Sequence, residues 1–270
     1  MSVGDAVPAL GLGTYGRTGA EGRAALETAV EIGYRHLDTA QDYGTEANVG
    51  ATVRESGLQR DAFFVTTKIA TGNLGAGEVI PSLERSCAVS GLDAFDLTLI
   101  HWPSPHGAIG PSVYLPQLAE AQARGLTRLI GVSNFTIALI EEAIGILGPN
   151  VIATNQIELH PYLQNRKLAD FCMANGIRVT CYQPIAMGRV GDDAGMREIA
   201  AAHNASPEQV ALAFEMAKGY VVIPASGRRA HLETNFAARH LKLAAEEVSR
   251  IEKLDRGQRY IDPAWGPDWD

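Results

Sequence analysis

Eight short β-rich runs alternate with amphipathic helical patterns along this chain, and this alternation predicts a (β/α)8 barrel. No Pro-, Gly- or Ser-rich linker interrupts the pattern, so we expect a single domain over residues 1–270. Polar residues also close neighbouring strand candidates, as they do at the carboxyl-terminal face of such barrels, where active sites lie. The expected strands lie near residues 7–12, 34–38, 62–67, 96–100, 128–132, 151–156, 177–182 and 220–223.

Helical patterns occupy the intervals between these strands. In the segment GEVIPSLERSCAVSGL, Val79, Leu83 and Cys87 recur every four residues and therefore share one face of a helix. Gly91 follows as a suitable C-cap, because glycine adopts the left-handed conformation without steric strain. This segment predicts a helix that packs one apolar face against the barrel.

Two helical patterns, at 192–203 and 206–218, lie between the seventh and eighth strands. The second begins with Ser206 as N-cap and Pro207 at the first helical position. One of the two is therefore an addition to the basic unit, and we expect a further extra helix near 244–255, after the eighth unit.

Composition disfavours several classes of partner. The chain has 270 residues, is 46% hydrophobic and carries a net charge of -8, which argues against nucleic acid and anionic membranes as partners. Three cysteines, Cys87, Cys172 and Cys181, lack metal-site spacing and indicate buried thiols in a reducing compartment. No secretion signal or membrane span is recognisable, so we expect a cytoplasmic protein.

The segment Gly11-Leu-Gly13-Thr-Tyr-Gly16 formally matches the GxGxxG motif of dinucleotide-binding folds. Asp38 follows the last glycine by about twenty residues, as such a fingerprint requires. However, Pro8 interrupts the preceding strand and a second glycine-bearing loop delays the helix. We therefore favour a tight turn over a Rossmann site, and expect only a modest effect of substituting Gly13.

Asp38, Lys68 and His101 each close a strand-like run, and Tyr43 lies five residues beyond Asp38. Each alone has a structural explanation, as a helix cap, a solvated strand end, a core histidine or a surface aromatic. Together, at neighbouring strand ends of one barrel face, they predict a set of groups that exchange protons. A half-buried Lys68 needs a carboxylate partner, and Asp38 on the adjacent strand is suitable.

A metal-dependent barrel hydrolase is an alternative, because His36, His101 and His160 lie near strand ends with Asp38 close by. No HxH or HExxH spacing is present, and Pro161 places His160 in a loop. We therefore expect no metal ion.

Polar and flat side chains also occur at the ends of the expected strands five to eight: Ser133-Asn134, Gln156, and Tyr182-Gln183. Asn and Gln amides pair with a carboxamide, and a tyrosine ring offers a stacking face. Nicotinamide has both a carboxamide and a flat ring, although loop capping would explain each residue singly.

After the eighth strand, Ser226, Arg228 and Arg229 stand where a helix should begin, the position of phosphate sites in many barrels. A solvated basic turn is the alternative. The tail RGQRYIDPAWGPDWD has no secondary-structure period, but it contains Trp265 and Trp269 and is expected to fold over another part of the protein.

With these residues in view, the sequence resembles the aldo-keto reductase family. The matching segments are GYRHLDTAQDYGTEANVG, FVTTKI, DLTLIHWP, GLTRLIGVSNF and NQIELHPYLQ, in the family's order and spacing from GLGT to the end of the chain. Within the family the match is best with a bacterial branch, on NQIELHPYLQNRK and the closing PDWD. The resemblance implies a barrel that binds extended NADPH across its strand ends, without a Rossmann domain.

The resemblance also implies roles for the four polar residues. Tyr43 would be the general acid that protonates the substrate oxygen. Lys68, paired with Asp38, would lower the pKa of the phenol from about 10 towards working pH. His101 would orient the carbonyl.

The binding residues expected from residue chemistry and from the resemblance form two sets. For the cofactor they are Gly13, Thr14, Asp38, Ser133, Asn134, Gln156, Tyr182, Gln183, Pro184, Ser226, Arg228, Arg229, His231 and Asn235. For the substrate they are Tyr15, Tyr43, His101, Trp102 and Trp265.

The phosphate segment departs from the family pattern IPKS with an arginine six residues after the lysine. Ala225 and His231 stand at those two positions, and Thr234 replaces a common acidic residue. Our hypothesis is that Arg228 and Arg229, with Ser226, bind the 2′-phosphate. Gln183 also stands where serine is common, a change without an evident reason.

The resemblance implies an NADPH-dependent reductase of small aldehydes, ketones or dicarbonyls such as methylglyoxal or diketogluconate-like compounds, with NADH as a second cofactor. We expect it to work as a monomer on small molecules. The alternatives are a cofactor-binding barrel with a regulatory or structural role, and the metal-dependent hydrolase.

Overall fold

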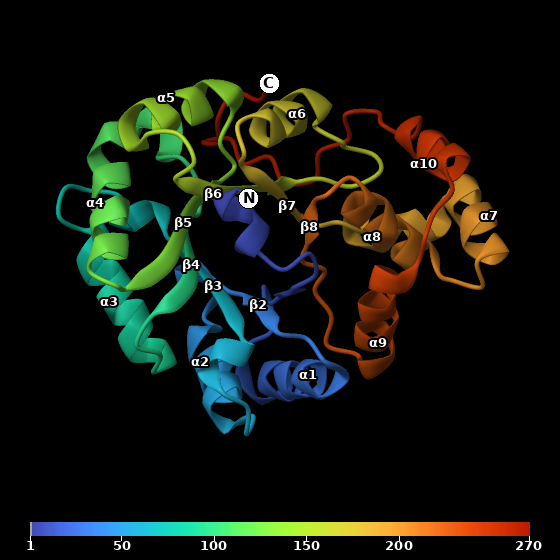
Figure 1. The fold of residues 1–270 in the computed structure, drawn as a ribbon, viewed down its shortest axis with the longest axis horizontal. Helices are drawn as coiled ribbons and strands as arrows, with labels where there is room; N and C mark the ends of the chain where they lie inside the picture. Colours follow the sequence, from blue (N-terminus) through green and yellow to red (C-terminus); the bar gives the residue numbers. More distant parts are fainter. Residues whose placement is uncertain (1) are drawn as a thin grey trace.

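The computed structural model describes residues 2–270, and its centre is a barrel of eight parallel strands ringed by helices (Figure 1). The strands neighbour one another in chain order. Hydrogen bonds between the first and last close the barrel: Gly11 N–H donates to the Val222 carbonyl at 2.9 Å, and Val222 N–H donates to the Ala9 carbonyl at 2.9 Å. The strands are β1 (Leu12–Gly13), β2 (His36–Asp38), β3 (Phe64–Ile69), β4 (Phe95–Ile100), β5 (Thr127–Ser133), β6 (Ile152–Glu158), β7 (Arg178–Tyr182) and β8 (Val221–Val222).

Helices follow the strands and cover the outside of the barrel (Figure 1). The α-helices are α1 (Gly19–Ile32), α2 (Glu46–Glu55), α3 (Val79–Ser90), α4 (Pro111–Ala123), α5 (Ile137–Leu147), α6 (Arg166–Ala174), α7 (Ala194–Ala202), α8 (Pro207–Ala217), α9 (Arg229–Ala237) and α10 (Ala245–Glu252). Short 3-10 helices are η1 (Val3–Ala6), η2 (Gln41–Tyr43), η3 (Arg60–Ala62), η4 (Thr71–Asn73), η5 (Pro105–Gly107), η6 (Ala186–Asp192) and η7 (Ala238–His240). Among residues 2–270, no helix has the length and apolar character that crossing a membrane requires.

The (β/α)8 prediction is confirmed, including both extra helices. α7 and α8 lie between β7 and β8, and α10 follows the eighth unit. The Ser206 hydroxyl accepts the Gln209 N–H, so the predicted N-cap of α8 is present. Gly91 ends α3 with a left-handed φ of 65°, as expected for a C-cap.

The first strand is the main difference from prediction. A strand was expected near 7–12, but β1 covers only Leu12–Gly13, and backbone pairing with β8 starts only at Ala9. Pro8 has no N–H to donate, which prevents an earlier ladder. Val7 instead packs with Phe64, Leu97 and other interior residues. The first segment thus fills one end of the barrel rather than extending its wall.

The hydrophobic core has two main layers. The larger cluster lies between the barrel and the inner faces of its helices; it includes Val79, Leu83 and, at its edge, Cys87. A second cluster joins α7, α8 and α10 through residues such as Met196, Phe214 and Ile251. The extra helices α7 and α10 therefore share one separate apolar layer on the outside of α8.

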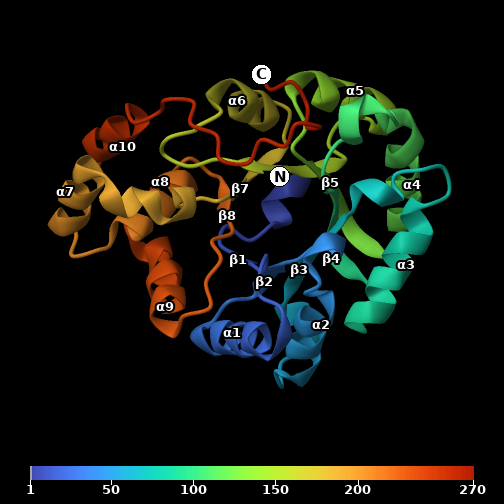
Figure 2. The same ribbon diagram turned by 180° about the vertical axis from the view of Figure 1, so that it is seen from behind.

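The C-terminal tail, residues 256–270, crosses the barrel near α6 and α5 (Figure 2). The buried Glu158 carboxylate at the end of β6 accepts the N–H groups of Tyr260 and Ile261, both at 2.8 Å. At the far end, the Asp270 carboxylate accepts the N–H of Ile137, the first residue of α5, at 3.0 Å. Gln258 N–H also donates to the Tyr162 carbonyl at 3.0 Å, and the Trp265 carbonyl accepts the His106 N–H at 3.1 Å. The tail is therefore attached at several points along its length, as its tryptophans suggested.

Candidate active site

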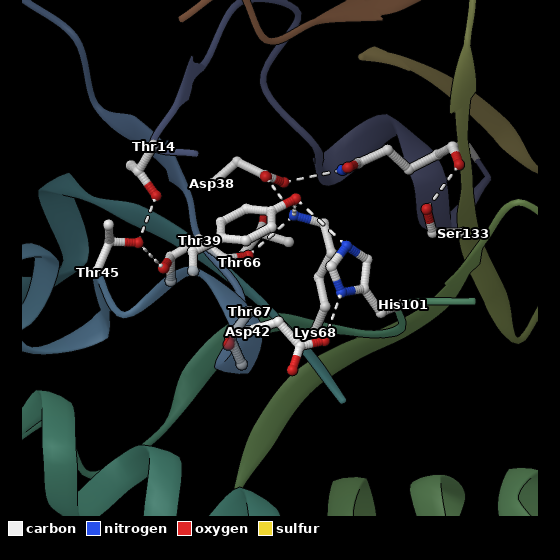
Figure 3. A network of polar contacts seen from close by, with 12 residues as sticks. Thr14, Asp38, Thr39, Asp42, Thr45, Thr66, Thr67, Lys68, His101 and Ser133 are labelled. Atoms are coloured by element: carbon white, nitrogen blue, oxygen red, sulfur yellow. Dashed lines mark hydrogen bonds and ion pairs between the residues drawn. The ribbon is translucent and has the colours of Figure 1, made fainter. Parts of the chain in front are cut away.

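The ends of β2 and β3 place a carboxylate and an ammonium together inside the barrel. Parallel pairing aligns Asp38 with Thr66, so Lys68 extends beside Asp38. Lys68 Nζ forms a salt bridge with Asp38 Oδ1 and donates to the Thr39 carbonyl at 2.9 Å. Both side chains are buried, with 0% and 1% exposure, and Figure 3 shows them at the centre of a polar network. The expected pair is present, and burial leaves each charge dependent on the other.

Tyr43 reaches this pair from η2, directly after β2. Its hydroxyl lies 3.4 Å from Lys68 Nζ and 3.3 Å from His101 Nε2. The Tyr43 ring packs edge-on against Tyr15 on one side and His101 on the other, with centroids 5.2 Å and 5.3 Å apart. The phenol is thus held between an ammonium and an imidazole by packing as well as by polar contacts.

The pKa of Tyr43 corrects one expectation. Burial raises the pKa of the phenol above its usual value of 10.0, and the Lys68 ammonium is the largest influence that opposes this rise. Lys68 therefore acts in the predicted direction, but burial has the larger effect on the pKa. The phenolate loses more free energy of solvation than it gains from attraction to the ammonium. The pKa of Lys68 is itself raised: burial would lower it, but the charges of Asp38 and Tyr43 overcome that effect. Both side chains hold their protons at neutral pH.

His101, at the end of β4, completes the group. Burial lowers the pKa of its imidazole below 6.5, although the nearby Asp42 carboxylate acts in the opposite direction, so the ring is neutral at pH 7. Its Nδ1 lies 3.5 Å from Asp42 Oδ2, too far for a strong hydrogen bond. Its backbone carbonyl accepts the Asn134 side-chain amide at 3.0 Å, which ties the β4 end to β5.

A second polar group lies at the ends of β5, β6 and β7. The Ser133 hydroxyl donates to the Gln156 carbonyl at 2.8 Å, and the Tyr182 hydroxyl donates to Asn134 Oδ1 at 2.8 Å. Gln156 Nε2 in turn donates to Asp38 Oδ2 at 2.8 Å. This hydrogen bond connects the two polar groups, so one continuous network spans the carboxyl ends of the strands.

Both groups open into one cleft with a volume of about 840 Å³. Such a size suits a dinucleotide-sized or smaller ligand. The cleft is lined by Gly13, Thr14, Tyr15, Asp38, Tyr43, His101, Trp102, Ser133, Asn134, Gln156, Tyr182, Gln183, Pro184, Ser226, His231 and Asn235, all predicted as site residues. The donor set fits a nicotinamide dinucleotide: amides and a flat tyrosine ring lie at one end, and Ser226 and Asn235 lie on the segment after β8.

Four predicted residues are not at the cleft surface. Lys68 is fully buried and acts from behind Tyr43. Arg228 and Arg229 are exposed outside the cleft, and Arg229 pairs with Glu31 and Glu233. Trp265 is absent from the cleft lining; its ring packs edge-on against Trp102 at 5.3 Å. The structure therefore does not bring either arginine to the ligand cleft.

Sequence reasoning missed several cleft residues. Arg17, Asp42, Met187, Glu208 and Ile261 all line it. They lie in loops, at a helix start and in the tail. In such segments the alternation of a strand is absent, so the sequence does not predict which way a side chain faces. Only Asp42, adjacent to Tyr43 in sequence, could have been found from its neighbour.

The glycine-rich segment forms the turn that leaves β1, and α1 begins only at Gly19. The Rossmann alternative is therefore wrong. The expectation that a substitution at Gly13 would be modest also needs correction. A Cβ at Gly13 would lie 2.8 Å from the Ile223 carbonyl oxygen, closer than van der Waals contact allows, so we expect the β1–β8 junction to shift.

The three histidines of the metal alternative have separate environments. His36 is buried with Nε2 3.1 Å from the Thr66 hydroxyl, and burial lowers its pKa to about 4. His160 Nε2 lies 3.0 Å from Glu158 Oε1, beneath the tail, while His101 faces the cleft. Within the described chain, no three His, Cys, Asp or Glu side chains are arranged to bind a metal ion.

Comparison with known proteins agrees with this geometry. Residues 9–256 match the model of the aldo/keto reductase family. Methylglyoxal reductase DkgB of Salmonella typhi is 48% identical over 265 residues, covering 98% of this chain and 99% of that protein. DkgB of Escherichia coli O157:H7 is 47% identical over 266 residues, covering 98% of this chain and all of that protein. The similarity to a bacterial branch of the family, which NQIELHPYLQNRK and PDWD indicated, is thereby confirmed, and the relatives of that branch are the methylglyoxal reductases DkgB.

Solved structures have the same fold. A crystal structure provisionally assigned as 2,5-diketo-D-gluconic acid reductase B superposes with a TM-score of 0.92 at 35% identity, covering all of this chain and 96% of that one. An aldo-keto reductase complexed with NADPH superposes with a TM-score of 0.90 at 30% identity, covering 95% of this chain and 87% of that one. The family match, the relatives and the barrel agree: the chain belongs to the aldo/keto reductase family of NAD(P)H-dependent oxidoreductases.

Proposed function

We propose that this protein is an NADPH-dependent reductase of small aldehydes, ketones and dicarbonyls, with methylglyoxal as a representative substrate. The observation that carries the proposal is the phenol of Tyr43, held between Lys68 and His101 at the wall of the cleft. The similarity to methylglyoxal reductases at 44–48% identity supports the substrate class.

NADPH supplies a hydride to a carbonyl carbon when it is bound. Ser133, Asn134 and Gln156 would hold its carboxamide, and the Tyr182 ring would provide a face for stacking. The hydrogen bond from Tyr182 to Asn134 keeps both side chains in fixed orientations. These residues would hold the nicotinamide ring near Tyr43, as catalysis by proximity requires.

Tyr43 donates the proton that the substrate oxygen needs as the carbonyl is reduced. The raised pKa of Tyr43 keeps the donor protonated, and Lys68, 3.4 Å from its hydroxyl, stabilises the negative charge that the phenol acquires on giving up its proton. Asp38 holds Lys68 in place and keeps its pKa raised. We assign the single proton of the neutral His101 ring to Nε2, from which it donates to the carbonyl oxygen and aligns it with Tyr43.

The walls of the cleft limit the substrate. Tyr15 and Trp102 line the cleft together with Tyr43 and His101, and Ile261 of the tail forms another part of its wall. A cleft with aromatic walls favours a compact carbonyl compound. We further propose that the protein works as a monomer in the cytoplasm; its three unpaired cysteines support a reducing compartment.

The test is the loss of 340 nm absorbance when purified protein is mixed with NADPH and methylglyoxal, followed by a panel of carbonyl compounds with NADPH and NADH. Reduction that persists with a chelator present is expected and would exclude the hydrolase alternative. Tight NADPH binding with no turnover of any carbonyl would instead identify a regulatory or structural role and overturn the proposal.

A further inference from the structure

Among the residues around the cleft, Arg17 differs from the others because it combines a positive charge with an unused hydrogen-bond donor. Within the described part of the chain, it is the one arginine or lysine that lines this cavity. It lies in the loop between β1 and α1, two residues after Tyr15, and is partly buried. The sequence contains no motif that marks it as a ligand-binding residue, and it takes no part in the proposed hydride and proton transfer.

The guanidinium of Arg17 lies against the segment that follows β8. A Cβ placed on Gly227 would be 3.9 Å from Arg17 Nη1 and 4.0 Å from its Cζ. The preceding residue, Ser226, is buried in the cleft wall, and its hydroxyl accepts the Arg228 N–H at 3.1 Å. Arg17 and Ser226 therefore flank the same part of the cleft.

This guanidinium has hydrogen-bonding capacity that the protein does not use. Arg17 Nε is buried and has no hydrogen-bond partner among the described residues, and Arg17 forms no ion pair with their carboxylates. The contrast with Arg229, which pairs with Glu31 and Glu233, is clear. A buried charged donor without an acceptor is unfavourable, so an anionic ligand at this place would satisfy it.

We propose that Arg17 binds the 2′-phosphate of the cofactor and thereby sets the preference for NADPH over NADH. This inference rests on the proposed function, which places the reactive ring at Tyr43 and leaves the adenosine half for the segment from Ala225 to Asn235. A phosphate monoester carries nearly two negative charges at pH 7, and a planar guanidinium binds it through two hydrogen bonds. Arg17 is the cation available there.

The proposal replaces the hypothesis that Arg228 and Arg229 bind the phosphate. Their side chains are exposed outside the cleft, whereas Arg17 lines it. Ala225 and His231 also line it. Alanine carries no charge, and a histidine lacks the permanent charge and the planar pair of donors that a guanidinium has. The charge therefore comes from the loop between β1 and α1, which lies against the segment that the sequence singled out.

The experiment measures binding without turnover. Titration of tryptophan fluorescence or calorimetry gives Kd for adenosine 2′,5′-bisphosphate, 5′-AMP, NADP+ and NAD+ with wild type and Arg17→Ala. We expect Arg17→Ala to weaken the two ligands that carry a 2′-phosphate by about 10- to 100-fold and the other two by less than twofold. Arg17→Lys should recover part of the loss, because it restores the charge but not the planar fork.

Two controls separate the outcomes. Arg85→Ala removes the same charge from an exposed position on α3 and should leave all four Kd values unchanged. The double variant Arg228→Ala, Arg229→Ala tests the competing hypothesis directly. Equal weakening of NADP+ and NAD+ by Arg17→Ala, no weakening at all, or a selective loss confined to the double variant would each overturn the assignment. If wild-type protein binds none of the four ligands, the proposed function itself fails, which is a different result.

Discussion

The two ends of the cleft are built in opposite ways. At the inner end, Lys68 and Asp38 are fully buried and satisfy each other, and Tyr43 is packed between two aromatic rings. At the outer end, Arg17 and Ser226 come from loops, and the Arg17 guanidinium keeps an unused donor. The inner end is complete without a ligand, whereas the outer end is completed by one. Substitutions should therefore change chemistry and stability at the inner end, and affinity at the outer end.

The largest expected effect is that of Tyr43→Phe. Removal of the proton donor should lower kcat for carbonyl reduction by about 10²- to 10⁴-fold, while the Kd of NADPH stays within threefold, since the ring still packs against Tyr15 and His101. Steady-state kinetics and fluorescence titration give the two numbers. Tyr114→Phe, which removes a hydroxyl from a tyrosine on α4 away from the cleft, is the matched control and should retain kcat. Near-normal turnover by Tyr43→Phe would contradict the mechanism.

The second prediction concerns the pair behind Tyr43. Lys68→Met leaves the Asp38 carboxylate buried without its ammonium and should lower the free energy of unfolding by about 3–5 kcal/mol, measured by urea denaturation. The double variant Lys68→Met, Asp38→Asn removes both charges and should recover most of that loss. A single variant as stable as wild type would show that the pair does not depend on both charges.

The same pair should control the pH profile. Reduction needs the protonated phenol, whose pKa lies above 10.0, so kcat should be flat through neutral pH and fall only as the pH rises through the raised pKa of Tyr43. Lys68 lowers that pKa, so the fall should occur at still higher pH in the double variant Lys68→Met, Asp38→Asn, which loses the ammonium. Asp38, whose charge raises the pKa, acts in the opposite direction and limits this shift. A fall in kcat between pH 7 and 8 in wild type would assign the rate to another group.

The tail lies between these two extremes, because it has no helix or strand of its own and part of it is hydrogen-bonded to one buried side chain, Glu158. Glu158→Ala removes the acceptor of two backbone N–H groups and should loosen residues 260 and 261. We expect faster trypsin cleavage after Arg256 and Arg259. The KM for methylglyoxal should rise by about tenfold, with a smaller change in kcat. Glu158→Gln keeps one acceptor oxygen and should fall between wild type and Glu158→Ala. Unchanged proteolysis in Glu158→Ala would show that the tail is held elsewhere.

The smallest effect is expected at Glu215, a buried carboxyl that, unlike Asp38, has no hydrogen-bond partner among residues 2–270. Burial raises its pKa well above 4.5. The folded state therefore holds a proton that the unfolded state releases, so stability falls as pH rises above about 4.5, by up to about 1.4 kcal/mol per pH unit. Glu215→Met should increase the free energy of unfolding at pH 8 by about 1–3 kcal/mol and flatten its pH dependence, with kcat unchanged. A destabilised Glu215→Met variant would indicate an unrecognised partner.

Much of the inner end could be predicted from the sequence. Asp38, Lys68 and His101 end short apolar runs, and parallel strands bring such ends to one face, so their meeting follows from the topology. The helix signals at Ser206 and Gly91 were equally local and equally correct. The direction of the Tyr43 pKa was not predictable, because it depends on how deeply the ring is buried.

The outer end shows where local patterns stop being informative. Arg228 and Arg229 stand at the expected place in the chain, but Arg229 turns outward to Glu31, a residue of α1 nearly two hundred positions earlier. Arg17, which no sequence pattern marks as a ligand-binding residue, lines the cleft instead. Trp265 lies against Trp102 rather than in the cleft, for the same reason: loop side chains are oriented by their tertiary neighbours.

By itself, the sequence determined the order of strands and helices, the family and the candidate group of four polar residues that includes Tyr43, because strand periodicity and short motifs encode which side chains share a face. Only the tertiary structure decided which cation borders the ligand cleft, how the tail is anchored, and whether burial or a neighbouring charge dominates at Tyr43. These depend on contacts between segments far apart in the chain, and on the exclusion of water that those contacts produce.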